Sequence, residues 1–202
     1  MANSHSGNSG RTLSVAALAD LPDLAARLSA DLRAAAIPHA VSGALAMAAY
    51  GYVRATRDID ILVAVPAVRL PQVFEIVRTH GFKGEDRELI ESLRERYMAE
   101  MRAGPVSVEI LVPVLPYHHT LIDRSVSLQV AGTEVPFISS EDLIVLKTLW
   151  HRTKDLADVK VLLAALGEKL DRDYVARTLE GILGERLRDV PEIQQVLDQI
   201  RE

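Results

Sequence analysis

The sequence contains no cysteine, which excludes disulfide bridges and thiolate metal sites. It also lacks any apolar run of the roughly 20 residues that a membrane-spanning helix needs. The first twelve residues are rich in Ser, Gly and Asn and have no apolar core of the kind found in signal peptides. These absences lead us to expect a cytoplasmic protein without membrane contact, with a disordered leader over residues 1–12.

The composition is that of an ordinary globular protein: 202 residues, 49% hydrophobic and 25% charged. This length fits one domain, or a small domain with a helical extension. The net charge of −5 provides no general attraction to nucleic acid, which argues against an RNA substrate without excluding one. A local basic patch could still form if five residues converge: Arg54, Arg57, Lys147, Arg152 and Lys154.

The most informative stretch runs from Val41 to Gly51, where small residues open a short helix, and continues into an apolar strand with Asp58 and Asp60. Residues i and i+2 of a strand point to the same face, so the two carboxylates stand about 7 Å apart at their Cα atoms. Two like charges at this separation are unfavourable unless a cation lies between them. The turn at Ser42, Gly43 and Ala44 offers backbone N–H groups that can cradle phosphate. The pattern therefore predicts a metal-dependent nucleotide site.

Two motifs carry a resemblance to a known family. Gly43-Ala44, followed after thirteen residues by Asp58-Ile59-Asp60, resembles the signature of the minimal nucleotidyltransferase superfamily, which shares the DNA polymerase β-like fold. Ser140–Lys147 and Arg152–Asp158 look like the "EDL…K…KDxxD" segments of the abortive-infection (AbiEii-type) toxin–antitoxin nucleotidyltransferases. Together the matches span roughly residues 37 to 166.

The resemblance implies a reaction, cofactors and partners. The reaction would be transfer of a nucleoside monophosphate from an NTP, such as ATP, to a hydroxyl of a tRNA or a protein side chain, with release of pyrophosphate. Two Mg²⁺ ions would bridge the carboxylates and the phosphates. The setting would be a toxin–antitoxin pair or phage defence, with a cognate toxin or antitoxin as partner.

Within this resemblance, Asp58, Asp60 and Glu109 would be the metal ligands, and Glu109 would also help to deprotonate the acceptor. The alternation of Val106, Val108 and Ile110 with Ser107 and Glu109 places Glu109 on the open face of its strand. The plain alternatives are a solvated pair of acids on an edge strand and a surface acid at Glu109.

The remaining candidates would contact the nucleotide. We expect Lys147 at the cleft edge, paired with triphosphate oxygens, and Lys154 against phosphate or base, with Asp155 and Asp158 orienting Lys147 or Arg152. The alternatives are an exposed lysine and acids that only favour a helix N-terminus. Further contacts would come from Ser42, Gly43 and Ala44 in the cradle and from Arg57, with Arg54, in the loop before the acidic strand; loop solubility is the alternative for these arginines.

Hydrophobic periodicity predicts an α/β domain over residues 13–138 and a C-terminal helical bundle over residues 139–202. The resemblance implies that the α/β domain is a nucleotidyltransferase palm, a mixed sheet with flanking helices. In the palm we expect helices over 14–36, 43–50 and 67–80, strands over 37–42 and 58–65, and hairpins joining 97–101 to 106–112 and 126–130 to 134–138. In the bundle we expect a capping box at Ser139 and Asp142 and helices over 140–151, 155–166, 172–185 and 191–200.

Some features favour other functions. Ala44 stands where the signature usually has Gly or Ser, and Glu109 where Asp is more common, which suits a catalytically silent relative acting as an antitoxin or interaction module. A metal-dependent phosphohydrolase is a weaker alternative, because such enzymes combine several His with Asp and this sequence lacks that cluster. His118 and His119 lack partners at zinc spacing and are interpreted as exposed loop residues. Trp150 is interpreted as core packing between helices.

Overall fold

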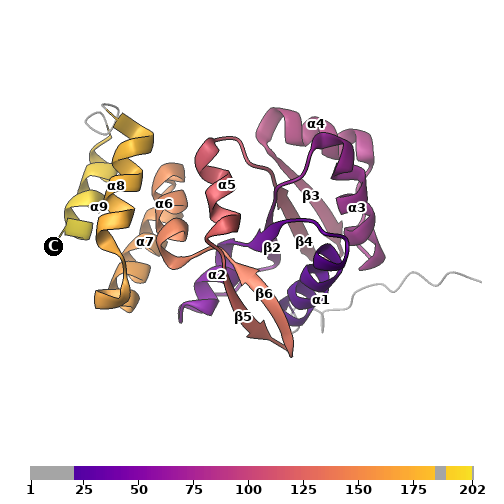
Figure 1. Ribbon diagram of the computed structural model, residues 1–202, viewed down its shortest axis with the longest axis horizontal. Coiled ribbons are helices and arrows are strands. Elements are labelled where there is room, and N and C mark those ends of the chain that lie inside the picture. Colours follow the sequence, from indigo (N-terminus) through magenta and orange to yellow (C-terminus); the bar gives the residue numbers. More distant parts are fainter. Residues whose placement is uncertain (1–20, 185–189, 202) are drawn as a thin grey trace, which may run out of the picture.

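The computed structural model describes residues 21–184 and 190–201. A six-stranded mixed sheet forms its centre, in the order β3-β4-β2-β1-β6-β5 (Figure 1). β2 is parallel to β4 and β1 to β6, while β1–β2, β3–β4 and β5–β6 are antiparallel. The strands are β1 (His39–Val41), β2 (Asp58–Val63), β3 (Met98–Ala103), β4 (Val106–Leu111), β5 (Val126–Val130) and β6 (Thr133–Phe137).

Helices pack around the sheet, and α6–α9 gather at the end opposite α3 and α4 (Figure 1). None of the helices in the described ranges is long and apolar enough to cross a membrane. The helices are α1 (Leu21–Ala34), α2 (Gly43–Ala49), α3 (Leu70–Thr79), α4 (Asp86–Arg96), α5 (Pro116–Asp123), α6 (Ser140–Trp150), α7 (Thr153–Leu166), α8 (Arg172–Leu183) and α9 (Pro191–Arg201), with 3₁₀ turns at Ala67–Arg69 and Gly167–Lys169.

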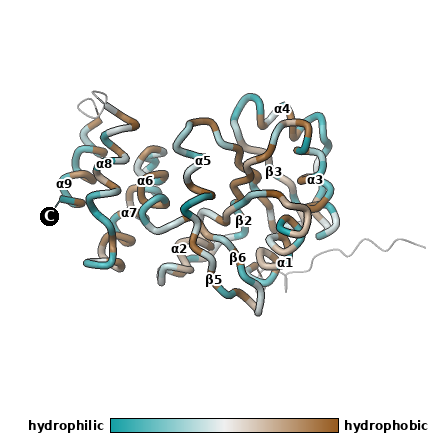
Figure 2. The backbone as a smooth tube through the Cα atoms, viewed as in Figure 1, coloured by the Kyte–Doolittle hydropathy of each residue, from teal (hydrophilic) through white to brown (hydrophobic). Residues whose placement is uncertain are grey.

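Two hydrophobic clusters hold these layers together. One joins the strands to α1, α3 and α4, and includes the buried side chains of Leu28, Ile59 and Phe74. The other extends from Leu62 in β2 through the C-terminal helices to Ile200. Hydrophobic and hydrophilic stretches alternate along α8 in Figure 2, as expected for a helix with one buried side. The second cluster crosses the expected boundary at residue 138, so the C-terminal helices share a core with the sheet.

Most expected elements are confirmed. Both hairpins form, the short helix follows β1 directly, and the C-terminal helices lie within two residues of their expected bounds over the described residues. Ser139 caps α6, with its Oγ accepting a hydrogen bond from the Asp142 N–H at 3.2 Å. In place of the reciprocal capping-box bond, the Ser139 hydroxyl donates to the Asp142 carboxylate. The expected leader, residues 14–20 of the first helix and residue 185 lie outside the described residues.

Two helices were not expected, α4 and α5. α4 is strongly charged, and only Leu89 and Leu93 are fully buried, so its hydrophobic stripe is narrow. α5 begins at Pro116, whose fixed φ suits the first turn of a helix. The interpretation of His118 and His119 as loop residues is therefore wrong. The His118 ring accepts the Val114 N–H at 3.0 Å and is partly buried, whereas His119 is exposed.

The interpretation of Trp150 as core packing is also wrong. Trp150 is the last residue of α6, and 39% of its surface is exposed. The chain leaves the helix through His151, which has a left-handed φ of 36°. A tryptophan at a helix end can present its ring to solvent or to a ligand, since it lies beyond the packed part of the helix.

Candidate active site

The turn between β1 and α2 is pressed against the acidic strand. The Ser42 N–H donates to the Asp60 carbonyl at 2.8 Å, and Gly43 follows with a φ of 61°. A Cβ atom built on Gly43 would lie 1.7 Å from Asp60 Oδ2. Glycine is therefore required here twice, for the left-handed backbone and for the space that the carboxylate occupies.

Three carboxylates meet on one face of two neighbouring strands. Asp58 and Asp60 alternate with buried Ile59 and Ile61 on β2, and Glu109 on β4 is the direct partner of Asp60. Asp58 lies opposite Ser107, whose hydroxyl donates to Asp58 Oδ1 at 2.7 Å. The register thus brings together the acids that the sequence places 49 to 51 residues apart.

The protonation of these acids reflects their crowding. Burial, the negative charge of Asp60 and a hydrogen bond with Asp60 raise the pKa of Glu109 from 4.5 to about 7. Burial also raises the pKa of Asp60, against the opposing effect of the bond from Glu109. In the metal-free protein the pair therefore holds a proton up to near-neutral pH, and a bound cation would replace it. Within the described residues, no group of three or more His, Cys, Asp or Glu is arranged to hold a metal by itself.

A network of ion pairs stands beside the acids, where α6 meets α7. Lys147 is buried, with its Nζ atom 2.5 Å from Asp158 and 3.5 Å from Asp155. Arg152 also binds Asp155 at 2.5 Å, and Arg54 lies 3.7 Å from Asp158. Each of these two aspartates thus forms ion pairs with two cations. The alternative of an exposed Lys147 is wrong, and the two acids do more than favour a helix N-terminus.

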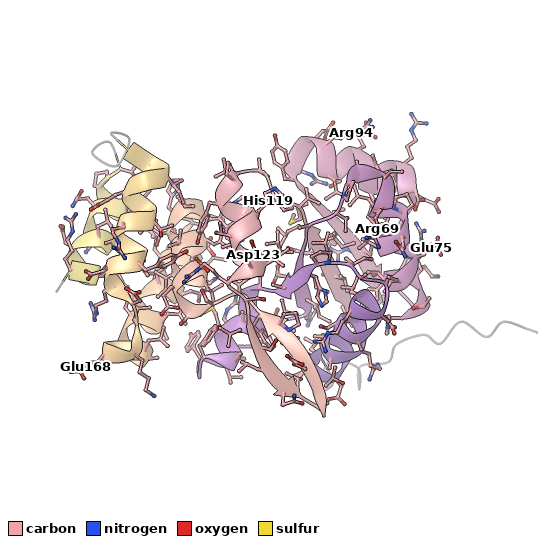
Figure 3. All side chains as sticks on the ribbon, in the orientation of Figure 1. Arg69, Glu75, Arg94, His119, Asp123 and Glu168 are labelled. Atoms are coloured by element: carbon pink, nitrogen blue, oxygen red, sulfur yellow. The ribbon has the colours of Figure 1, made fainter. Side chains whose placement is uncertain are left out.

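These groups face a hollow of about 380 Å³ between the sheet and the C-terminal helices. In contrast, charged residues such as Glu75, Arg94 and Glu168 lie on the outer surface (Figure 3). Four of the five basic residues expected to converge do so here: Arg54, Lys147, Arg152 and Lys154. The full lining is Gly43, Ala44, Arg54, Thr56, Asp58, Asp60, Arg96, Met98, Glu109, Leu111, Lys147, Trp150, Arg152, Lys154 and Asp155.

Three expected site residues do not line this hollow. Asp158 lies behind Lys147 and reaches the hollow through that lysine and through Arg54. Arg57 is exposed and lines a separate depression with Arg54 and Asp58. Ser42 is buried and lines a neighbouring cavity, and its Oγ atom has no hydrogen-bond partner in the structure.

Ser107, Arg96 and Trp150 were not expected at the site. Ser107 could have been predicted at the site, because strand alternation places its side chain on the same face as that of Glu109, which lies two residues further along β4. Arg96 ends α4, a helix that periodicity did not reveal, and Trp150 reaches the hollow only because α6 ends beside the sheet. Neither position carries a local sequence signal.

The fold has known counterparts among solved structures. The solution structure of the antibiotic-resistance factor ANT(2'')-Ia matches with a TM-score of 0.55 at 16% identity, covering 88% of this chain and 98% of that one. The crystal structure of ANT(2'')-Ia in complex with adenylyl-2''-tobramycin matches with a TM-score of 0.55 at 18% identity, covering 82% and 97%. At such identities the likeness shows the fold alone, which is the expected nucleotidyltransferase fold.

Comparison with curated protein sequences gives no significant match. A family model described as "Uncharacterised nucleotidyltransferase" matches residues 15–184, which include the glycine turn, the three carboxylates and the network around Lys147. On this match the chain belongs to that uncharacterised nucleotidyltransferase family.

Proposed function

We propose that this protein transfers a nucleoside monophosphate from an NTP to a hydroxyl acceptor. The observation that carries the proposal is the convergence of Asp58, Asp60 and Glu109 with the cation Lys147 in one hollow beside the Gly43 turn. Acids and cations on facing walls suit a triphosphate, which needs charge neutralisation from metal and lysine together.

The three carboxylates fit Mg²⁺. Hard oxygen donors suit this ion, which commonly uses one or two carboxylates and completes its coordination with substrate phosphates and water. A fully preformed cage is therefore not needed. The proton shared by Asp60 and Glu109 supports a site built for positive charge. When bound, one or two Mg²⁺ ions would neutralise phosphate charge and acidify the acceptor hydroxyl.

The chain's own residues would then act as follows. The acceptor oxygen bonds to the α-phosphorus, the bond to the oxygen bridging to the β-phosphorus breaks, and pyrophosphate leaves with the electron pair. Glu109 takes the hydroxyl proton, since its carboxylate lies beside Asp60 on the neighbouring strand. Lys147, held by Asp155 and Asp158, stabilises the charge on the leaving group.

Arg152 and Lys154 are exposed and would meet the outer phosphates or the base. The buried Ala44 keeps its N–H group for the nucleotide but supplies no hydroxyl. This departure favours the second candidate, a silent antitoxin or interaction module. A toxin–antitoxin or defence setting, with tRNA or a protein side chain as acceptor, rests on the motif at Glu141, Asp142 and Lys147 and on Lys154–Asp158.

Titration calorimetry with a non-hydrolysable NTP, with and without Mg²⁺, tests the proposal. Wild type should bind only with Mg²⁺, and Asp58→Asn and Asp60→Asn should bind much more weakly. Asp123→Asn, the same change at an exposed position of α5, serves as control. Absence of NTP binding in wild type would favour the silent module. Incubation with each labelled NTP, Mg²⁺ and cell extract would then show which class of molecule is labelled.

A further inference from the structure

A second cavity, of about 350 Å³, adjoins the carboxylate hollow. It lies between the sheet and helices α5 and α6, and its walls are mainly aliphatic: Leu62, Leu111, Leu121, Ile138 and Leu146. This volume lies within the range of pockets that enclose small organic ligands. Arg96 also lines this cavity and is shared with the carboxylate hollow, where the further cations Lys147, Arg152 and Lys154 would suit a triphosphate.

The leucines on the floor of this cavity lie on the same face of the sheet as the carboxylates. Leu62 follows Asp60 by two residues on β2, and Leu111 follows Glu109 by two residues on β4, so all four side chains share one face. Leu62 and Leu111 are direct partners in the sheet. Residues i and i+2 of a strand lie about 7 Å apart, so a small molecule that packs on the two leucines reaches the carboxylates with one end.

The mouth of the cavity is lined by exposed apolar side chains. Tyr97, Val114, Leu115 and Trp150 are 49%, 43%, 40% and 39% exposed, and all four line the cavity. In the described ranges, the other large hydrophobic residues with such exposure are only Val53, Val68 and Val126. A cluster of exposed apolar side chains around an opening is typical of a ligand-binding site.

One further feature points to a ligand, whereas the left-handed φ of 59° at Tyr97 belongs to the C-cap of α4. Ser42 also lines the cavity, is 1% exposed, and has an Oγ atom with no hydrogen-bond partner among residues 21–184 and 190–201. An unpaired buried hydroxyl costs free energy, which a polar group of a ligand would recover.

We infer that this cavity binds the acceptor, and that the acceptor is a small molecule carrying a hydroxyl on an apolar ring or chain, in place of the tRNA or protein side chain that the motifs suggest. The inference rests on the proposed transfer reaction. The apolar body lies on Leu62 and Leu111 behind the mouth at Trp150. The hydroxyl oxygen attacks the α-phosphorus beside Asp60 and Glu109, its proton passes to Glu109, and pyrophosphate departs with the electrons of the broken bond.

The test uses 2-cyclohexylethanol as probe and the fluorescence of Trp150, the single tryptophan, as readout. Wild type should show saturable binding with a blue shift of the emission, because the ring would become less exposed. Val114→Arg puts a charge at the mouth and should weaken binding about tenfold or more, since it sets a hydrated cation against an apolar ligand. Val68→Arg, at an exposed valine that does not line the cavity, should change it by less than about twofold.

A non-hydrolysable NTP with Mg²⁺ is titrated into the same samples. The probe should stay bound, because nucleotide and acceptor occupy adjoining spaces. Displacement of the probe by the NTP would show that the cavity holds the base and would overturn the inference. Equal weakening in Val114→Arg and Val68→Arg would do the same, and Leu115→Arg provides a second variant if Val114→Arg does not fold.

The two proposals fail separately. NTP binding without probe binding removes the small apolar acceptor and leaves nucleotide transfer standing. Probe binding without NTP binding removes the transfer reaction, and with it the role of the cavity as an acceptor site. Labelling of RNA in cell extract that Val114→Arg does not reduce would also overturn the inference in favour of a polynucleotide acceptor.

Discussion

Asp142 is a buried acid and Asp60 a partly buried one, and their neighbours differ. Asp142, on α6, accepts hydrogen bonds from Tyr117 at 2.8 Å, Tyr174 at 2.6 Å and Ser139 at 2.7 Å. It also forms an ion pair with Arg124 at 3.1 Å. These donors come from α5, α8 and the residues that follow α5 and precede α6. The carboxylate therefore ties together α5, α6 and α8.

Asp60 instead faces another acid. Its carboxylate lies against Gly43 on one side and shares a hydrogen bond with Glu109 on the other. Asp142 has its donors within the protein, whereas the Asp60–Glu109 pair keeps acceptor capacity for a cation from outside. The difference separates an acid that stabilises the fold from acids that are kept for a ligand.

The sharpest test of this comparison is Asp60→Asn. It removes one of the crowded charges, so we expect transfer to fall by about a thousandfold, roughly 4 kcal/mol, as for a lost electrostatic group in other enzymes. The melting temperature in metal-free buffer should not fall, because repulsion with Glu109 is relieved. Matched kinetics and thermal melts against Asp123→Asn check both statements. A protein that loses stability but keeps its rate would show that Asp60 is structural.

Asp142→Asn should behave in the opposite way. An amide cannot accept all the bonds that the carboxylate accepts, so hydroxyl and guanidinium donors are left without partners. We expect a loss of about 3 kcal/mol in the free energy of unfolding. NTP affinity, measured well below the melting temperature, should change little. Urea unfolding of the variant and of Asp123→Asn gives the comparison, and a difference below about 1 kcal/mol would contradict it.

Most of the acidic half of the candidate site could be predicted from the sequence. Alternation in β2 and β4 placed Asp58, Asp60 and Glu109 on open faces, since period-two patterns report directly on side-chain direction. The parallel pairing that sets Asp60 against Glu109 is a tertiary fact, but only a few registers keep both apolar faces buried. The glycine turn was also visible, because a run of small residues between a strand and a helix is typical of a tight backbone approach.

The basic half was much less predictable. Residues 142 to 148 of α6 are all buried, so helical periodicity cannot say which side of this helix is open. The burial of Lys147 depends on Asp155 and Asp158 from α7, which reach it only after the two helices pack. α4, α5 and the mouth at Tyr97 and Trp150 likewise follow from packing that no local pattern encodes.

The burial of Lys147 leads to the next prediction. Lys147→Met leaves Asp155 and Asp158 with Arg152 and Arg54 as partners, so we expect a loss of about 2 kcal/mol in stability, less than for a fully stranded pair. Nucleotide affinity should also fall. Lys154→Met, an exposed neighbour, should leave the melt unchanged. If the melts of the two variants agree, the ion-pair network contributes nothing to stability.

The shared proton makes stability depend on pH. The pKa of Glu109 is about 7 in the folded protein and 4.5 ordinarily, so the folded state holds the extra proton between these values. The free energy of unfolding in metal-free buffer should therefore fall as the pH rises from about 5 to about 7. Glu109→Gln should flatten this profile, and Mg²⁺ should bind wild type more tightly at pH 8 than at pH 6, with proton release. Denaturant titrations across this range, with calorimetry in buffers of different ionisation enthalpy, measure both effects.

The smallest effect is expected at Ser107, which contacts Asp58 but does not line the carboxylate hollow. Its hydroxyl holds Asp58 Oδ1 at 2.7 Å, as a positioning residue behind a metal ligand does. Ser107→Ala should weaken Mg²⁺ binding about tenfold, in line with other second-layer partners of metal ligands. Stability should change by less than about 1 kcal/mol, because one hydrogen bond is lost and the site is open to water on one side. Ser107→Thr keeps the hydroxyl and should recover part of the Mg²⁺ affinity. If Ser107→Ala binds Mg²⁺ as wild type does, Asp58 is oriented by its strand alone, and the contrast with the fully bonded Asp142 becomes sharper still.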